Sequence, residues 1–254
     1  MNEKSSDMIS EYLEVWEREF KGWDFSYLEK YGRMREFPLS WNYYNEIRKY
    51  LKDSQSLLDM GTGGGEFLSE LIPLPKKTCA TEGYRPNLEI AKKRLEPLGV
   101  KVYEIKEDDN MPFDDEEFDL IINRHESYSE KEVRRILKKG GYFITQQVGG
   151  CNDKELNMYL NAEPFEYREW DLDKAVKNLE KNNFKIIKRK EDKTKTRFYD
   201  ICAVIYYLKA ISWQISDFSI DKYYIKLREL DFLIEEMDYI DVTCHRFIII
   251  ACKN

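Results

Sequence analysis

The sequence has no apolar run long enough to cross a membrane and no closely spaced cysteines. Its longest strongly apolar stretch, residues 201–208, is far shorter than the roughly 18 residues that a spanning helix needs. The N-terminal stretch also lacks the basic flank and apolar core of a secretory signal. The 5 cysteines are scattered singly, which is typical of free thiols in a reducing compartment. We therefore expect a cytoplasmic protein without a membrane anchor.

Histidine is scarce, and positive charge is not in excess. With only 2 histidines and no Cys-x-x-Cys pair, a metal centre is not expected. The 41 Lys and Arg residues are outnumbered by 48 Asp and Glu residues, which leaves a net charge of −7. Because phosphate neutralisation needs clustered Lys and Arg, this balance argues against a broad surface for nucleic acid or anionic lipid. A hydrophobic content of 42% is typical of a globular chain that buries a core.

The middle of the chain alternates apolar strands with amphipathic helices. The predicted strands of this part are 56–60, 77–81, 100–105, 118–122 and 142–148. Successive strand–helix–strand units predict an α/β fold with a parallel, doubly wound sheet. The aromatic-rich residues 1–53 precede it and are predicted to be helical. A helical insertion at about 195–238 separates two further predicted strands, 184–190 and 245–252.

A glycine-rich turn, Asp59-Met60-Gly61-Thr62-Gly63-Gly64-Gly65, follows the first of these strands and precedes a helix. Glycines at such a turn let the backbone bend tightly and approach a ligand without a Cβ in the way. Glu82 stands at the end of the next predicted strand, where a carboxylate can accept hydrogen bonds from both hydroxyls of a ribose. Together the turn and the acid predict a nucleoside ligand.

The dinucleotide-binding pattern G-x-G-x-x-G helps to identify the kind of nucleoside, because its third glycine can be compared with this sequence. That fingerprint requires a glycine where this chain has Glu66, and a carboxylate at the start of the helix would repel a pyrophosphate. A cationic sulfonium meets no such objection. The pattern D-x-G-x-G-x-G over Asp59–Gly65 resembles motif I of the class I S-adenosylmethionine-dependent methyltransferases. The resemblance implies a Rossmann-like, seven-stranded, mostly parallel sheet and S-adenosyl-L-methionine as cofactor.

Further segments extend this resemblance over about 55–150. Residues 107–113 resemble the family's adenine-side loop, 118–121 its fourth-strand motif, and 137–141 its L-x-P-G-G motif, with Lys139 in place of the proline. The adenine-side acid is either Glu107 or Asp108. The cofactor-binding residues that the resemblance implies are Asp59, Gly61, Thr62, Gly63, Gly65, Glu82, Gly83, Tyr84, Glu107, Asp108 and Asn123.

Polar residues that follow the fourth strand are the candidates for catalysis, because this strand end borders the ligand crevice of the fold. His125 is the preferred general base or substrate orienter, since a histidine pKa lies near working pH. Glu126 either orients His125 or acts as the base itself, and Arg124 is suited to bind a substrate carboxylate or phosphate. A purely structural role for His125 and Arg124, capping strand and helix ends, is the alternative.

Aromatic and polar residues in the flanking helical segments are candidates for a cover over the substrate. We expect 1–53 to form a helical lid and 54–254 the methyltransferase domain, with a substrate cap at about 195–238. The candidate substrate contacts are Arg33, Trp41, Tyr199 and Trp213. Core packing is the alternative for each of them.

These patterns together predict a methyltransferase that uses S-adenosylmethionine and acts on a small molecule. The alternatives are an RNA or protein methyltransferase, a protein that binds the cofactor without catalysis and, more remotely, an NAD-dependent oxidoreductase. The acidic net charge and the absence of an appended basic module speak against an RNA target. Glu66 speaks against a dinucleotide.

Overall fold

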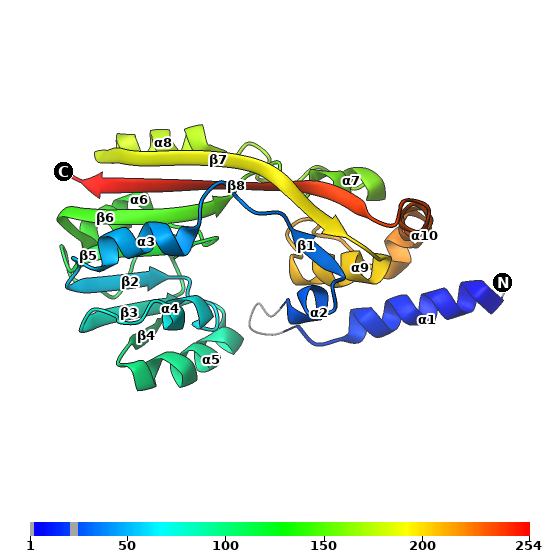
Figure 1. Cartoon of the computed structure of the whole chain (residues 1–254), viewed down its shortest axis with the longest axis horizontal. Coiled ribbons are helices and arrows are strands. Elements are labelled where there is room, and N and C mark those ends of the chain that lie inside the picture. Colours follow the sequence, from blue (N-terminus) through cyan, green and yellow to red (C-terminus); the bar gives the residue numbers. More distant parts are fainter. Residues whose placement is uncertain (1–2, 21–24) are drawn as a thin grey trace. The chain divides into compact units, whose positions relative to one another are not determined.

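The computed structural model describes residues 3–20 and 25–254, which form two compact units. The first, which we call the sheet unit, comprises Leu39–Gly149, Trp170–Asp192 and Arg246–Asn254. The second, the helical unit, comprises the described residues up to Pro38, Gly150–Glu169 and Lys193–His245. Figure 1 labels the elements of both units along the chain. Residues 1–2 and 21–24 of the expected lid lie outside the described residues.

The sheet unit contains most of the alternating pattern. Its elements up to the sixth strand are α3 (Tyr43–Leu51), β2 (Ser56–Met60), α4 (Glu66–Glu70), β3 (Lys77–Glu82), α5 (Arg85–Leu95), the 3-10 helix Glu96–Leu98, β4 (Lys101–Glu104), β5 (Phe118–Arg124), α6 (Glu130–Ile136) and β6 (Leu137–Val148). It also contains α8 (Leu172–Lys181) and parts of β7 (Phe184–Phe198) and β8 (Ile240–Lys253). The central strands thus form where the apolar runs predict them.

Within the described residues, the sheet has eight strands in the order β1-β7-β8-β6-β5-β2-β3-β4. Strands β2 to β6 pair in parallel, whereas β8 pairs antiparallel with β6, and β1 (Met34–Glu36) antiparallel with β7. The predicted α/β class is confirmed, but the expected count of seven strands is corrected to eight. The extra strand is β1, which lies in the segment predicted to be helical. Its pairing with β7 is a long-range contact that no local periodicity reports.

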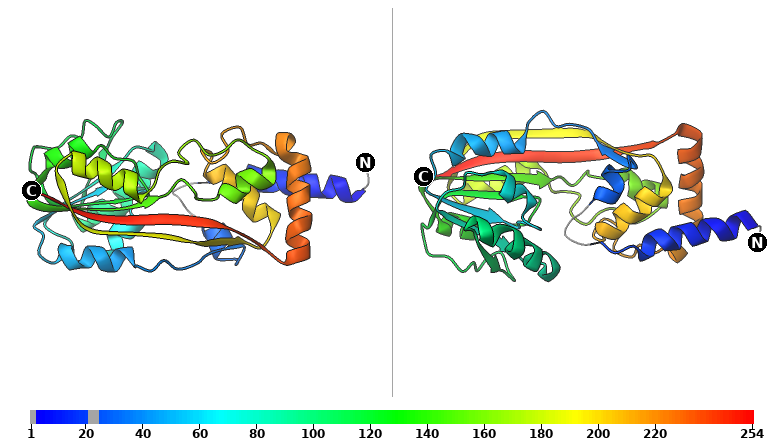
Figure 2. Two further views of the ribbon diagram at one scale, coloured as in Figure 1. Left: turned by 90° about the horizontal axis from the view of Figure 1, so that it is seen from above. Right: turned by 60° about the horizontal axis from the view of Figure 1, so that its bottom comes forward.

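Strands β7 and β8 are longer than their sequence patterns predict. They extend over Phe184–Phe198 and Ile240–Lys253, so that 195–198 belongs to a strand rather than to the expected helical insertion. Both views of Figure 2 show the two strands side by side. In the outer part of β7, exposed residues alternate with half-buried ones, and most of both kinds are polar. Such an alternation is a weaker signal for a strand than an apolar run.

Two apolar layers sandwich the sheet unit's strands. On one face, Leu57, Ile122 and Ile144 pack in one cluster with residues of α3, α4 and α5. On the other face, Leu58 and Ile121 pack with residues of α6 and α8. Neighbouring residues of one strand therefore pack into opposite apolar layers. This explains why β2 and β5 are apolar almost throughout. This packing makes the strand ends a rigid base for the loops that follow them.

The helical unit contains α1 (Glu3–Glu17), α2 (Ser26–Glu29), β1, α7 (Lys154–Leu160), α9 (Ile201–Ala210) and α10 (Ile220–Met237). Helix α9 is buried along nearly its whole length and forms the centre of this unit's core, together with residues of α1, α7 and α10. It begins at Asp200, whose side chain accepts a hydrogen bond from the Ala203 N–H at 2.8 Å. In the part of the chain that the structure describes, no helix is long and apolar enough to span a bilayer.

Candidate functional site

The candidate site lies where β2, β3, β5 and β6 end. The strand registers pair Asp59 with Ala80, Met60 with Asn123, and Asn123 with Thr145. Because these strands are parallel, the loops that follow them leave the sheet along the same edge. The glycine turn, the Glu82 loop and the segment after β5 are therefore neighbours, as their positions in the sequence predict.

The glycine turn is built around Gly61. Its φ of +67° lies in the left-handed region, and a Cβ built at this position would come within 2.4 Å of the Glu126 Cγ atom. The turn is tied to β3, since the Thr62 N–H donates to the Thr81 carbonyl oxygen at 2.9 Å. Only a residue without a side chain both adopts this backbone and leaves room for Glu126.

The Glu82 side chain points back onto the glycine turn. One carboxylate oxygen accepts the Gly63 N–H at 2.7 Å, and the other accepts the Tyr84 N–H, also at 2.7 Å. Glu82 is buried, and burial raises its pKa above the usual value although these backbone N–H groups act in the opposite direction. A carboxylate has about four acceptor positions, so Glu82 can also receive a hydrogen bond from a ligand.

Asp59 lies beneath the turn at the end of β2. It is buried and accepts a hydrogen bond from the Thr62 hydroxyl at 2.8 Å. Burial raises its pKa to about 7, and the charge of Glu82 acts in the same direction, while Thr62 and Arg124 lower it. Asp59 therefore holds the turn through Thr62. The negative charges of the neighbouring acids disfavour binding of a negatively charged group at this place.

A buried amide without a partner lies close along the chain to Glu82. Asn87 belongs to the first turn of α5 and is completely buried, yet neither its amide nitrogen nor its amide oxygen has a hydrogen-bond partner within the described residues. Leaving such a group unpaired costs about 1–3 kcal/mol, so it is the kind of group that a bound ligand completes. Sequence reasoning missed this residue because one Asn in an amphipathic helix has no distinguishing pattern.

The segment after β5 brings the three catalytic candidates together. Arg124 ends the strand and lies over the Phe67 ring at 5.3 Å, while His125 adopts a φ of +62° and donates its N–H to the Gln146 carbonyl oxygen at 2.8 Å. Glu126 follows, with its side chain directly over Gly61. Burial raises its pKa to about 7, with further contributions from the Asp108 and Glu82 charges.

A hydrogen-bonded chain of side chains determines which nitrogen of His125 carries the proton. The Trp41 indole N–H donates to Gln146 Oε1 at 2.8 Å, and Gln146 Nε2 lies 2.9 Å from His125 Nε2. An amide NH₂ only donates, so His125 Nε2 accepts and the proton of the neutral ring is on Nδ1. Surrounding protein atoms, together with the Arg246 and Arg124 charges, hold the His125 pKa well below its usual range although the residue is exposed.

These contacts predict opposite tautomers for the two histidines of the chain. The Cys151 N–H donates to His245 Nδ1 at 3.3 Å, which places the His245 proton on Nε2, whereas that of His125 is on Nδ1. We expect nitrogen-15 spectra to show this contrast, and the His125 ring to stay neutral below pH ~6. His125→Gln assigns the resonances, and Trp41→Phe, which frees the amide, should mix the His125 tautomers. An ordinary titration of His125 near pH ~6.5 would contradict the assignment.

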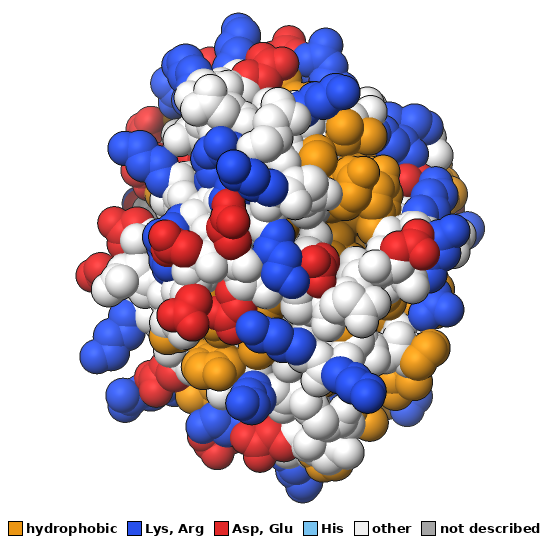
Figure 3. Space-filling view, turned by 90° about the vertical axis from the view of Figure 1, so that its left-hand side faces the viewer, with side chains coloured by type: hydrophobic (Ala, Val, Ile, Leu, Met, Phe, Trp, Pro, Cys, Tyr) orange, Lys and Arg blue, Asp and Glu red, His pale blue; other side chains and the backbone are white. Residues whose placement is uncertain are grey.

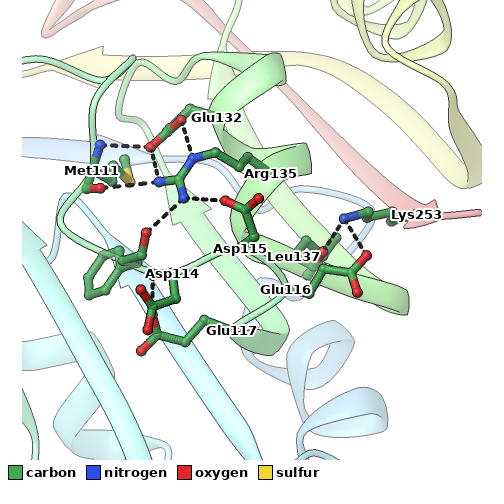
Figure 4. A network of polar contacts seen from close by, with 10 residues as sticks. Met111, Asp114, Asp115, Glu116, Glu117, Glu132, Arg135, Leu137 and Lys253 are labelled. Atoms are coloured by element: carbon green, nitrogen blue, oxygen red, sulfur yellow. Dashed lines mark hydrogen bonds and ion pairs between the residues drawn. The ribbon is translucent and has the colours of Figure 1, made fainter.

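The adenine-side loop is fastened to α6 by Arg135 (Figure 4). Its guanidinium donates to the Phe113 carbonyl oxygen at 2.8 Å, to the Met111 carbonyl oxygen at 3.2 Å, and to both carboxylate oxygens of Glu132. Glu132 in turn accepts the Met111 N–H at 2.8 Å. Of the two acids predicted for this loop, Glu107 is exposed, whereas Asp108 accepts the Ser127 hydroxyl next to Glu126. The contacts therefore favour Asp108 as the acid that faces the site.

The opposite ends of these strands carry a shallow hollow of about 620 Å³. Its lining residues are Asp115, Glu116, Lys131, Arg134, Arg135, Lys139 and Lys253. Figure 3 faces this side of the molecule and shows Lys and Arg interspersed with Asp and Glu. Arg135 and Lys253 are engaged in ion pairs with Asp115 and Glu116, so part of the positive charge is balanced within the protein.

The four predicted substrate contacts belong to different units. Trp41 is buried in the sheet unit, where its indole binds Gln146, whereas the other three are part of the helical unit. Arg33 forms an ion pair with Asp200 at 3.0 Å and accepts the Tyr199 N–H at its carbonyl oxygen. Tyr199 and Trp213 are exposed. Contact of these residues with a substrate stays a prediction.

Two residues behave differently from their sequence assignment. Asn123, predicted to bind the cofactor, is completely buried, and its amide oxygen accepts the Thr145 hydroxyl at 2.9 Å and the Gln147 amide at 2.7 Å. Its cofactor contact stays a prediction, and what the structure shows is that it holds the β5 and β6 ends together.

Gln146, which connects Trp41 with His125, was not predicted. The Gln-Gln pair near the end of β6, which follows the run Tyr142–Ile144, is the signal that identifies it.

The remaining predicted cofactor residues lie around Glu82 and the turn. Gly83 follows Glu82 directly, and the exposed Tyr84 contributes the N–H that binds Glu82. Gly65 packs over α5, where a Cβ would come within 2.7 Å of Leu95 Cγ. Among the residues that the structure describes, no group of three or more His, Cys, Asp or Glu side chains is arranged to hold a metal ion.

Sequence comparison connects this site with known proteins. Residues 58–145 match the family model of a methyltransferase domain. An uncharacterized protein of Methanocaldococcus jannaschii is 27% identical over 228 residues, which cover 80% of this chain and 76% of that protein. The uncharacterized methyltransferase YcgJ of Bacillus subtilis is 24% identical over 114 residues, which cover 41% of this chain and 45% of YcgJ.

Solved structures share the fold. The crystal structure of YcgJ matches with a TM-score of 0.57 and 17% identity, covering 84% of this chain and 98% of YcgJ. A protein of Bacillus halodurans C-125, described as a candidate methyltransferase, matches with a TM-score of 0.56 and 19% identity, covering 83% of this chain and 96% of the other. The resemblance to class I methyltransferases is thereby confirmed.

Proposed function

We propose that this chain, whose residues 58–145 form a methyltransferase domain, transfers a methyl group from S-adenosylmethionine to a small organic acceptor. The observation that carries the proposal is the Glu82 carboxylate turned onto the glycine turn, with its oxygens 2.7 Å from the Gly63 and Tyr84 N–H groups. A buried carboxylate at this strand end is suited to bind the two hydroxyls of a ribose.

Several features of the site fit an adenosyl sulfonium. Gly61 lets the Glu126 side chain lie directly against the turn, and the unpaired Asn87 amide offers both a donor and an acceptor. Asp59, Glu82 and Glu126 make the site acidic, which suits a positively charged sulfur and opposes a pyrophosphate. When bound, S-adenosylmethionine supplies an electrophilic methyl group; the protein's own residues bind, orient and deprotonate.

Glu126 and His125 have different roles in this proposal: one removes a proton from the acceptor, and the other orients the acceptor. His125 Nε2 already accepts the Gln146 amide, so His125 presents an Nδ1–H donor that can orient an acceptor oxygen or carboxylate. Glu126, with a pKa of about 7, is the group with a free lone pair suited to take a proton from an acceptor hydroxyl or ammonium. Arg124, exposed beside them, is suited to an acidic group of the acceptor.

A small acceptor is the favoured substrate class. The net charge of −7 argues against a broad surface for a nucleic acid. Arg33, Trp41, Tyr199 and Trp213 remain the candidate substrate contacts, and Trp41 is connected with His125 through Gln146. A lid role for the N-terminal helical residues belongs to this proposal.

The proposal is tested by calorimetry and a methyl-transfer assay. We expect S-adenosylmethionine and S-adenosylhomocysteine to bind with affinities in the micromolar range, which corresponds to about −8 kcal/mol. Labelled methyl groups should then appear on members of a panel of small amines, alcohols and carboxylic acids. Absence of binding of both ligands at millimolar concentration would overturn the proposal. Binding without transfer to any acceptor, including RNA and protein, would favour a cofactor-binding protein without catalysis.

A further inference from the structure

The Glu126 side chain lies on the surface of the glycine turn that a ligand must approach. A Cβ built on Gly61 would come within 2.4 Å of Glu126 Cγ, 2.6 Å of its Cβ and 2.8 Å of its Oε2. The main chain holds it there, because the Gln147 side-chain amide donates to the Glu126 carbonyl oxygen at 2.9 Å. A ligand held by Glu82 and the turn is therefore expected to meet Glu126 directly.

The groups around Glu126 are predominantly acidic. Asp108 faces it from the loop after β4 and Glu82 from the end of β3, and the charge of Glu82 also raises the pKa of Asp59 at the end of β2. The Ser127 hydroxyl donates to Asp108, and its oxygen lies 3.5 Å from Glu126 Oε1. The positive groups nearby, Arg124 at the end of β5 and Arg246 in β8, act on His125, and Arg124 acts also on Asp59. Glu126 thus lacks a cationic partner of its own within the described residues.

We infer that Glu126 distinguishes the cationic methyl donor from its neutral product by exchanging a proton with the solvent. Its carboxyl group releases the proton when a sulfonium binds beside it and takes one up again when a neutral thioether remains. The inference rests on the proposed function and assigns Glu126 a role in donor selection and product exchange. No bond other than the O–H bond of Glu126 forms or breaks in this step, and water carries the proton.

The protonation state of the free site makes this exchange possible near neutral pH. Burial and the neighbouring acids raise the Glu126 pKa to about 7, so close to half of the free molecules carry the proton at pH ~7. A positive charge nearby stabilises the carboxylate and lowers the pKa, whereas a neutral sulfur does not. Below pH ~7 the donor must therefore displace a proton, and its affinity falls as pH falls.

Calorimetry on the full chain separates the two ligands. Titrations with S-adenosylmethionine and S-adenosylhomocysteine in buffers of different ionisation enthalpy measure protons released on binding. The α-amino and carboxyl groups are common to both ligands, so the difference between the ligands reports the sulfonium. We expect about half a proton more to be released by the donor at pH ~7. Between pH ~7.5 and ~5.5 its affinity relative to the product should fall about 20-fold.

Two variants identify the residue responsible. Glu126→Gln keeps the shape of the side chain and should abolish the difference in proton release between the two ligands and the pH dependence of their relative affinity. Glu70→Gln removes the same charge from an exposed position on α4 and should behave like the unmodified chain.

The outcomes are distinct. Equal proton release by both ligands in the unmodified chain overturns the inference and leaves the proposed function intact. A difference that persists in Glu126→Gln assigns the proton to another acid, such as Asp59, and also overturns it. Failure of either ligand to bind the unmodified chain overturns the proposed function itself. The measurement on the unmodified chain does not depend on the folding of any variant.

Discussion

Replacing Glu82 by alanine is expected to lower the affinity for S-adenosylhomocysteine about 100-fold. Hydrogen bonds to a charged acceptor contribute about 1.5–3 kcal/mol each, so loss of two ribose contacts costs about 3 kcal/mol or more. The variant also leaves the Gly63 and Tyr84 N–H groups without their acceptor, which adds to the loss by loosening the turn. Calorimetric titration measures the change, and circular dichroism establishes that the variant is folded.

A matched carboxylate serves as control for Glu82. Glu104 lies in the neighbouring strand β4, opposite Glu82 in the register, but it is exposed and pairs with Arg85 at 3.0 Å. Glu104→Ala should leave affinity within about threefold, because an exposed ion pair contributes little. If Glu82→Ala and Glu104→Ala bind the ligand equally well, Glu82 does not contact the ribose, and the assignment of the site fails.

Replacing Gly61 by alanine is expected to abolish measurable ligand binding. Two effects add at this position: the left-handed backbone, which costs an L-residue about 1–2 kcal/mol, and the collision of the new Cβ with Glu126 Cγ at 2.4 Å. The collision forces either the turn or Glu126 to move, and both belong to the ligand surface. The thermal midpoint of unfolding should fall by several degrees, which differential scanning calorimetry measures.

Gly99 separates the two effects. It has a comparable φ of +81° after the short 3-10 helix, and nothing lies within 4 Å of a Cβ built there. Gly99→Ala should therefore lower stability by about 1–2 kcal/mol and leave ligand affinity unchanged. Loss of binding in both variants would mean that general destabilisation, rather than the shape of the turn, controls affinity. Normal binding by Gly61→Ala would show that the ligand does not approach this turn.

The central α/β pattern was predictable because its signals are local. Apolar strands such as Ser56–Met60 and Phe118–Arg124 are buried on both faces and read as near-continuous hydrophobic runs. Helix α6 begins after Ser129, whose side chain accepts the Glu132 N–H, which is a local signal of the same kind. The Glu132 carboxylate binds Arg135 and the Met111 N–H, and the contact with Met111 is one that no local pattern indicates.

The N-terminal segment shows where such reasoning fails. Residues 1–53 are predicted to form a helical lid, yet α3 packs on the sheet through Ile47 and Leu51, whereas α1 contributes Tyr12 to the core of the helical unit. Between them lies β1, whose residues Met34–Glu36 pair with the far end of β7. Strand pairing over such a separation depends on the partner being in place, which no window of sequence reports.

From the residues alone, one could read the class of the fold, the glycine turn, the acid at the end of the second central strand and the polar segment that contains His125. These follow from chain periodicity and from the backbone needs of a tight turn, both of which are local properties. The roles of the side chains were decided by tertiary contacts: Gln146 and Trp41 select the His125 tautomer, and burial near Asp108 and Glu82 shifts the Glu126 pKa. Protonation depends on the desolvation and charges that surround a group in space, and distant segments supply both.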